Sequence, residues 1–279
     1  MKDYILSAFA DEYDTDFETQ LTALRQFGIE NIELRFVNGI NVADLTDAQV
    51  AEVKEMLKRF GIRVSAIGSP IGKISLDGDM KTHFEKAKRV FCTANTLGAK
   101  NIRCFSFYPP ANKPIGDCRH EVIARMTQLL DLADRYSVTL CHENEAGIYG
   151  ESPENCLDLL QSFDGRLKAV FDMGNFVLDG YDPVKALALL QPYIAYFHIK
   201  DALYAGAIVP AGKGEACIRQ ILQNYPARQT VVTLEPHLQT FSGLNALVGK
   251  TFENPYQYPD QRAAFSDAAA CIHGVLEEL

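Results

Sequence analysis

The sequence contains no apolar run long enough to cross a membrane as a helix, so we expect neither a membrane span nor a membrane partner. Its N-terminus, MKDYILSAFADEYD, has an apolar run that is too short for a signal peptide, and ILSAF is expected to form a first strand. The sequence also contains no C-x-x-C pair, and its seven cysteines are scattered along the chain. These absences favour a cytoplasmic protein with reduced, mostly buried thiols.

Basic residues are fewer than acidic ones. Lysine and arginine number 27 against 36 aspartates and glutamates, which gives a formal net charge of -9. This balance argues against broad neutralisation of phosphate backbones, although a local basic cleft is compatible with it, and we expect no nucleic-acid partner. The sequence also lacks a linker, a low-complexity segment or a block of like charges. Residues 1–279 are therefore expected to form one domain.

Strand-like and helix-like patterns alternate along the whole chain. Apolar helical spacing follows each strand, and local signals mark several helix ends, such as the capping box formed by Thr46 and Gln49 before a helix that Gly61 ends. Apolar strands that alternate with helices indicate parallel pairing, and eight such units predict a single (β/α)8 TIM barrel. An open, doubly wound sheet is the alternative. The expected strands are residues 5–9, 31–37, 62–67, 101–107, 138–143, 167–172, 194–199 and 229–234.

Residues 239–260 follow the eighth expected strand and show no clear periodicity. This segment is expected to be a long loop with aromatic content, placed where it could cover the mouth of the barrel. The last helix is expected from about residue 261 to residue 276.

The stretch VTLCHENEAGIYG, residues 138–150, places four polar residues in succession at the end of the fifth expected strand. Strand alternation directs Glu143 and Glu145 to one face and His142 to the other. Two acids on one face of an apolar strand are costly unless a cation or water lies between them. Cys141 is the cysteine that adjoins this cluster, and it is either a core residue or part of the site.

Strands five to eight each end in a side chain that can bind a metal. In a barrel of this kind, catalytic residues stand at the C-terminal ends of the strands. Three carboxylates and one imidazole suit one divalent ion, Mn²⁺, Mg²⁺, Co²⁺ or Zn²⁺, with positions left for water or substrate. The expected metal ligands are Glu143, Asp172, His198 and Glu235.

The segments HENEAGIYG, VFDMGN, YFHIKDA, GKGE and LEPH resemble the xylose isomerase-like TIM barrel superfamily, in order and over the whole chain. That superfamily includes sugar and sugar-phosphate isomerases and epimerases, inosose dehydratase and endonuclease IV. The resemblance to its ketose epimerase branch implies the same four ligands. It also implies that Glu143 and Glu235 exchange protons with the carbon next to a substrate carbonyl, through an enediolate that the metal stabilises.

Four further residues are expected to bind a small sugar or polyol substrate: Lys200, Asn175, His237 and Glu145. Lys200 is either a partner for an oxyanion, carboxylate or phosphate, or a structural lysine that pairs with Asp201 or Glu215. Glu145 either contacts substrate at the rim or anchors residues 148–150. The epimerases carry a histidine and an arginine where this chain has Asn175 and Lys200-Asp201, so their substrate is not transferred. Phosphate binding is left open, with Arg35, Arg103, Ser69 and Lys213 as candidates.

Three alternatives to an isomerase or epimerase remain. An inosose-type dehydratase would use the same metal and the same acid and base. An endonuclease IV-like nuclease is less favoured, because it needs a trinuclear zinc site with histidines from early strands, and none of the six histidines here ends strands one to four. A non-catalytic barrel that binds a ligand through the metal is the third. A homo-oligomer is also left open.

Overall fold

The computed structural model describes residues 4–226, 229–239 and 255–279. Eight parallel strands close into a barrel, in which neighbours along the chain are neighbours in the sheet and the last strand pairs with the first. This closure confirms the (β/α)8 barrel and excludes the open sheet. The strands are β1 (Tyr4–Ala8), β2 (Asn31–Leu34), β5 (Arg63–Ile71), β6 (Asn101–Cys104), β7 (Thr139–Glu143), β8 (Lys168–Asp172), β9 (Ile194–Ile199) and β12 (Thr230–Leu234).

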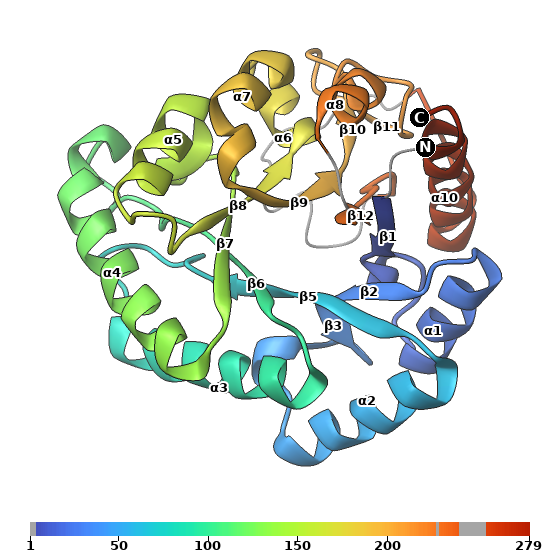
Figure 1. The fold of residues 1–279 in the computed structure, drawn as a ribbon, viewed down its shortest axis with the longest axis horizontal. Helices are drawn as coiled ribbons and strands as arrows, with labels where there is room; N and C mark the ends of the chain where they lie inside the picture. The colour runs from blue at the N-terminus through green and yellow to red at the C-terminus, as the bar shows by residue number, and fades with distance from the viewer. Residues whose placement is uncertain (1–3, 227–228, 240–254) are drawn as a thin grey trace.

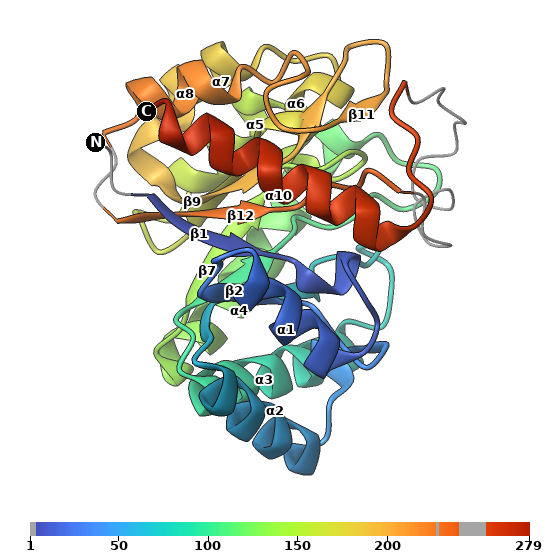
Figure 2. The ribbon, with the colours of Figure 1, turned by 90° about the vertical axis from the view of Figure 1, so that its right-hand side faces the viewer.

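The helices form an outer ring around the strands (Figure 1). Figure 2 shows α10 running along the outside of β1 and β12. Each barrel strand is followed by at least one helix, as the alternation predicts. The α-helices are α1 (Phe17–Gln26), α2 (Asp47–Phe60), α3 (Met80–Leu97), α4 (Arg119–Tyr136), α5 (Pro153–Gln161), α6 (Met173–Leu178), α7 (Pro183–Leu190), α8 (Ile218–Asn224) and α10 (Gln261–Glu277).

Short elements connect the barrel units at the ends of the strands. Two small antiparallel hairpins follow β2 and β9. These elements are β3 (Phe36–Val37) with β4 (Ile40–Asn41), β10 (Asp201–Ala202) with β11 (Ile208–Val209), and the 3-10 helices η1 (Ala10–Glu12), η2 (Val42–Asp44), η3 (Ile115–Cys118), η4 (Tyr149–Glu151) and η5 (Gln191–Tyr193).

Local chemistry fixes several helix ends. At the start of α2, Thr46 and Gln49 form both bonds of the predicted capping box, a feature worth about 1 kcal/mol. Gly61 ends the same helix in a left-handed conformation with φ of 64°, which a residue without Cβ adopts at little cost. Asp182 caps α7 with Pro183 at its first position.

Three strand ends differ from the prediction by more than one residue. β2 ends at Leu34 rather than at residue 37, and Phe36–Val37 form the separate strand β3. β5 runs on to Ile71, past the expected end at residue 67, and β6 ends at Cys104 rather than at residue 107. Phe107 has a left-handed φ of 67°, which an extended strand does not tolerate. The segment after Cys104 instead bonds back to the end of β5, where Phe105 N donates to Ile71 O at 2.7 Å. α6, directly after β8, was not predicted.

Apolar side chains fill two separate regions. The larger region lies between the strands and the surrounding helices. The smaller one consists of Ala66, Cys141, Val170 and Tyr196, which point into the barrel. Cys141 is therefore a packed core residue, and burial raises the pKa of its thiol well above the ordinary value. This inner layer leaves the C-terminal ends of the strands for polar side chains.

Candidate metal centre

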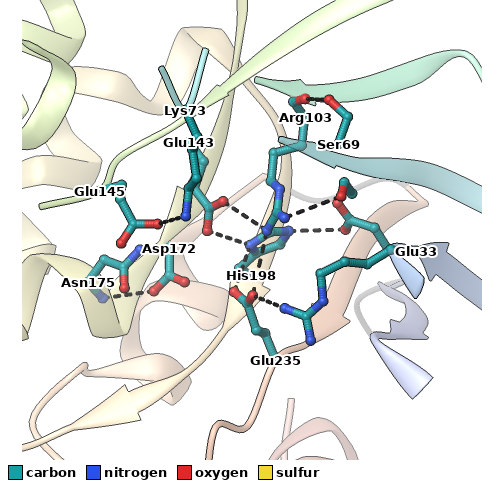
Figure 3. Close-up of polar contacts among 12 residues, drawn as sticks. Glu33, Ser69, Lys73, Arg103, Glu143, Glu145, Asp172, Asn175, His198 and Glu235 are labelled. Atoms are coloured by element: carbon teal, nitrogen blue, oxygen red, sulfur yellow. Dashed lines mark hydrogen bonds and ion pairs between the residues drawn. The ribbon is translucent and has the colours of Figure 1, made fainter. Parts of the chain in front are cut away.

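Four polar side chains converge at the C-terminal end of the barrel. Glu143 ends β7, Asp172 ends β8, His198 stands one residue before the end of β9, and Glu235 directly follows β12. Strand register aligns them, because His198 pairs with Asp172 on one side and with Thr233 on the other. One possible ligand atom from each of the four lies within 4.8 Å of the others, and all four residues are buried. Figure 3 shows this cluster.

Asp172 serves two elements at once. Its Oδ1 accepts a hydrogen bond from Asn175 N at 2.8 Å and so caps α6, while its Oδ2 stays on the cluster side. Asn144 holds the same backbone from β7, since its Oδ1 accepts from Asp172 N at 3.0 Å. Gly174 is needed here, because a Cβ would lie 2.8 Å from the Lys200 carbonyl oxygen. The start of α6 therefore fixes the direction of the Asp172 carboxylate.

His198 lies at the centre of the cluster. Its Nδ1 is 2.8 Å from Glu143 Oε1 and 3.1 Å from Glu235 Oε2, and its Nε2 is 3.0 Å from Glu33 Oε2. Burial alone would lower the pKa of His198, but the surrounding carboxylates raise it well above its ordinary value. The Phe9 ring packs against the imidazole in a T-shaped arrangement, with the two ring centroids 5.2 Å apart, and completes its burial.

Three cationic side chains surround the same carboxylates. Arg103 Nη1 lies 3.1 Å from Glu143 Oε2 and 3.5 Å from Glu235 Oε1. Arg35 Nη1 lies 3.0 Å from Glu235 Oε1, and its other nitrogens bind Asp11 and Glu12.

Lys200 Nζ is 2.9 Å from Asp172 Oδ2 and 3.2 Å from Glu235 Oε2. Burial lowers the pKa of Lys200, but these two carboxylates raise it above the ordinary value, so the amine is charged.

The charges in this cluster do not balance without a further cation. Six carboxyl groups meet three fixed cations among the residues that the structure describes; with Glu12 protonated and both histidines neutral, as metal binding to His198 requires, this leaves an excess of two negative charges. Buried carboxylates without a counter-charge are costly, and a donor set of three carboxylates and one imidazole matches hard or borderline divalent ions. The residues therefore fit a divalent metal. The carboxylates are those of Asp11, Glu12, Glu33, Glu143, Asp172 and Glu235, and the cations are Arg35, Arg103 and Lys200.

A second group with metal-binding atoms adjoins the first and shares Glu235 with it. Glu12, Glu235 and His237 offer atoms within 4.8 Å of one another. The guanidinium of Arg35 already bridges Glu12 and Glu235, so a cation is present there. Burial raises the pKa of Glu12 to about 8 in spite of Arg35, which makes it a neutral acid near pH 7.

A cavity of about 660 Å³ opens beside this second group, on the β1, β2 and β12 side of the cluster. Asp11, Glu12 and Arg35 line it, and its other walls hold both apolar side chains, such as Phe36 and Leu238, and polar ones, such as Gln261. Because Arg35 contacts Glu235, the cavity adjoins the four-residue cluster. It is large enough for a small sugar.

The family model of xylose isomerase-like TIM barrels matches residues 21–250. The chain belongs to this family. The match confirms the resemblance drawn from the sequence motifs. The family is enzymatic and includes epimerases and dehydratases. No curated protein matches the sequence.

Solved structures of xylose isomerase-like barrels superpose over nearly the whole chain. The probable 3-DHS dehydratase AsbF of Bacillus anthracis is 20% identical, with a TM-score of 0.73, and the match covers 97% of this chain and 98% of that one. D-Allulose 3-epimerase from Methylomonas sp., in complex with D-allulose, is 14% identical, with a TM-score of 0.76 and coverage of 100% and 98%. The IOLI protein with a bound zinc atom is 18% identical, with a TM-score of 0.73 and coverage of 100% and 99%. At these identities the likeness shows the fold alone.

The four predicted substrate-binding residues of this family member lie in different surroundings. Lys200 and Asn175 are in the cluster, where Lys200 Nζ donates to Asn175 Oδ1 at 3.0 Å. His237 Nε2 points at Glu12 and Glu235, at 3.3 and 3.5 Å. Glu145 lies outside the cluster, half-buried, where it accepts from Lys73 Nζ at 2.7 Å. Three of the four predicted residues therefore adjoin the candidate ligands.

Two contacts that the sequence offered as alternatives do not form among the described residues. Lys200 does not pair with Asp201 or Glu215 but with Asp172, because Asp201 turns to accept the backbone N–H groups of the 212–216 loop. Glu145 does not anchor residues 148–150.

The backbone of Gly150 in that segment donates instead to Ser106 Oγ, which also contacts His142 Nε2 at 2.9 Å. His142 thus lies on the outward face, as alternation predicts.

Among the phosphate candidates, Arg35 and Arg103 face carboxylates, Ser69 Oγ donates to Arg103 O, and Lys213 is exposed. The six histidines do not form a trinuclear set, since only His198 and His237 are at the cluster. Most of the predicted loop at 239–260, namely residues 240–254, lies outside the described residues. In the part of the chain that the structure describes, no helix is both long and apolar enough to span a membrane.

Sequence reasoning missed Glu33 as a member of the site. Glu33 is on β2, far from the four strands that carry the candidate ligands, and yet it contacts His198. A signal existed, because Glu33 and Arg35 are two residues apart and so share a strand face. The strand pattern does not indicate which partner each would reach across the barrel.

Proposed function

We propose that this protein is a metal-dependent isomerase or epimerase of a sugar or sugar phosphate, which moves a proton at the carbon next to a carbonyl. The observation that carries this proposal is the convergence of three carboxylates and one imidazole at the ends of four successive strands. In this reading residues 1–279 act as one domain. Their unpaired cysteines support a cytoplasmic location.

Glu143, Asp172, His198 and Glu235 would hold one divalent ion, Mn²⁺, Mg²⁺, Co²⁺ or Zn²⁺. The zinc atom in the IOLI structure supports an ion of this class. A bound divalent ion supplies Lewis-acid polarisation of the carbonyl and stabilises the negative charge of the enediolate.

Glu143 and Glu235 are the proposed proton carriers. They approach His198 Nδ1 from different strands, β7 and β12, so they can reach a substrate from two sides. Burial raises the pKa of Glu143, but His198 and Arg103 lower it to about 2, so without the metal the carboxylate is ionised. One carboxylate that takes the proton and another that returns it on the opposite face would invert the carbon.

Lys200, Asn175 and His237 surround the proposed ligands and would bind substrate oxygens, with Glu145 at the rim. The adjoining cavity suits a small sugar or polyol, and the D-allulose bound in the Methylomonas enzyme supports a substrate of that size. The acidic net charge supports a small molecule over nucleic acid. A homo-oligomer is left open.

An inosose-type dehydratase on the same site is the second candidate. Glu12 favours it, because a neutral carboxylic acid beside the cluster can protonate a leaving hydroxyl. The presence of a dehydratase among the similar structures is in keeping with this candidate.

The decisive experiment is isotope exchange in D₂O with the metal-loaded protein and a panel of ketoses, ketose phosphates and inososes. We expect deuterium to enter the carbon next to the carbonyl, detected by NMR and mass. Glu143→Gln, which is also expected to lose the metal, should slow this exchange by at least the loss of about 10²–10⁴-fold that a missing general base causes. Loss of water from a substrate would instead identify the dehydratase. Bound metal without exchange or elimination on any substrate would contradict both.

Metal content tests the ligand assignment separately. Purified protein is expected to bind about one divalent ion, as a single ligand set implies. His198→Ala and Glu143→Gln should both lose it. The matched control is Glu145→Gln, which removes an acid two residues past the end of β7 and outside the cluster. Full retention of metal by both ligand variants would refute the assignment.

A further inference from the structure

We infer that Glu33 is a positioning residue, which fixes the His198 ring so that Nδ1 is the nitrogen that faces the metal. This inference rests on the metal centre proposed above. It concerns a residue that belongs neither to the four candidate ligands nor to the candidate substrate contacts. Glu33 and His198 are both fully buried.

The geometry places Glu33 on the far side of the imidazole from the ligands. Figure 3 shows Glu33 and Glu143 on opposite sides of His198. Glu33 Oε2 lies 3.0 Å from Nε2, whereas Glu143 and Glu235 approach Nδ1 at 2.8 and 3.1 Å. The two ring nitrogens point in different directions, so only one can face the ligand group. That nitrogen is Nδ1.

The chemistry of imidazole turns this geometry into a function. A carboxylate oxygen accepts hydrogen bonds, so the contact of Glu33 Oε2 with Nε2 calls for a proton on Nε2. The Nδ1 of a neutral ring then carries the lone pair that a metal requires. A carboxylate that accepts the other N–H also makes the ring a stronger donor to the metal.

Glu33 is itself held in place. The hydroxyl of Tyr196 donates to Glu33 Oε1 at 2.9 Å, so both carboxylate oxygens have partners. Tyr196 and His198 are two residues apart on β9 and share its inward face. Ala66, Cys141 and Val170 pack around Tyr196 and exclude water from this layer. In such surroundings a charge-assisted hydrogen bond is stronger and better directed.

A purely structural role for Glu33 predicts a different result when Glu33 is replaced. If Glu33 served only to hold β2 against β9, its replacement would lower stability without changing how His198 meets the metal. The test must therefore read the state of the His198 nitrogens directly, in addition to metal affinity.

The first measurement is ¹⁵N NMR of the histidine rings in the wild-type protein loaded with zinc. We expect His198 to show a metal-bound Nδ1 and a protonated Nε2 whose proton exchanges slowly and resonates downfield. Assignment follows from the loss of these signals in His198→Ala. Zinc on Nε2, or an Nε2 without a proton, would overturn the inference. This measurement needs no variant of Glu33 and so stands even if such variants fail to fold.

The second measurement is zinc affinity by competition with a chelator. Glu33→Gln should weaken zinc binding by about 10- to 100-fold and move the Nε2 proton signal upfield. Tyr196→Phe keeps the carboxylate and should have a smaller effect in the same direction. Ser65→Ala is the matched control, because Ser65 bonds to Ser7 and to the carbonyl of Ile32, the residue before Glu33, but does not touch His198.

The outcomes separate the two proposals. Wild-type protein that binds no divalent ion would refute the metal centre and this inference with it. Wild-type binding together with a Glu33→Gln affinity within twofold of it would refute only the positioning role.

Discussion

The two halves of the barrel mouth contribute different sets of side chains to the cluster. We define the late rim as the C-terminal ends of β7, β8, β9 and β12, and the early rim as those of β1, β2, β5 and β6. The late rim supplies all four candidate ligands. The early rim supplies the two arginines, Arg35 and Arg103, that reach across to Glu235 and Glu143, and it supplies Glu33, which reaches His198.

This difference shows how a carboxylate-rich site can be built inside a closed barrel. Late-rim carboxylates that lie close together repel one another, and burial adds to the cost. The early-rim arginines offset part of that cost and leave an excess of negative charge that a divalent ion can neutralise. The late rim thus supplies the groups that could bind a divalent ion, and the early rim affects the charge balance and the orientation of these groups.

The largest expected effect comes from removing an early-rim cation. Arg103→Met leaves Glu143 and Glu235 with one positive partner fewer in a buried site, and breaking such a pair typically costs about 3–5 kcal/mol. We expect the free energy of unfolding of the metal-free variant, measured by urea denaturation, to be lower by that amount. Saturating Mn²⁺ should restore a large part of the loss, because the ion neutralises the same carboxylates.

Arg166→Met is the control for this experiment, because Arg166 pairs with Asp131 and Asp134 at the surface. Its loss should cost less than about 1 kcal/mol, and metal should not alter the difference. If metal failed to recover any of the stability lost in Arg103→Met, the two rims would not share the role of charge compensation.

The change expected at Lys200, a late-rim cation, is smaller, and it is a gain in metal affinity rather than a loss of stability. Its ammonium contacts Asp172 and Glu235, two of the candidate ligands, and so competes with the metal. Repulsion between charges at this range is worth about 1–4 kcal/mol, so Lys200→Met should raise metal affinity by about tenfold or more while it lowers isotope exchange.

Chelator competition measures the affinity of Lys200→Met, with the exposed Lys185→Met as control. A weaker affinity would mean that Lys200 holds the ligands in place, and the contrast between the rims would then be one of geometry rather than charge.

Patterns that repeat along the chain predicted the fold well. Eight apolar strands between capped helices allow few arrangements, and the capping box at Thr46 depends on residues three apart. Strand ends also predicted which late-rim side chains would meet, since parallel strands end at one edge of the barrel. Asp172 and His198 are the example, as register pairs them directly.

Contacts between distant strands could not be predicted in the same way. Glu33 contacts His198, which is 165 residues away in the sequence, and Lys200 pairs with Asp172 rather than with its neighbour Asp201. The pairing of Lys200 depends on the 212–216 loop, because backbone N–H groups of this loop donate to the Asp201 carboxylate. Periodicity gives the face of a side chain, but the partner depends on how the side chains of the whole barrel share their hydrogen bonds.

The smallest expected effect is at Glu145, which lies on the late rim just past the end of β7. Glu145 lies two residues after Glu143, but its carboxylate meets Lys73 at the half-exposed rim, where Lys73 also packs 4.3 Å from the Phe105 ring centroid. Partly exposed ion pairs contribute little, so Glu145→Gln should lower stability by less than about 1 kcal/mol and leave metal affinity within twofold. A rise in KM without loss of metal would place Glu145 at the substrate. A loss of metal comparable to that of Glu143→Gln would instead show that the ligand set extends beyond the end of β7, and the boundary between cluster and rim drawn here would be wrong.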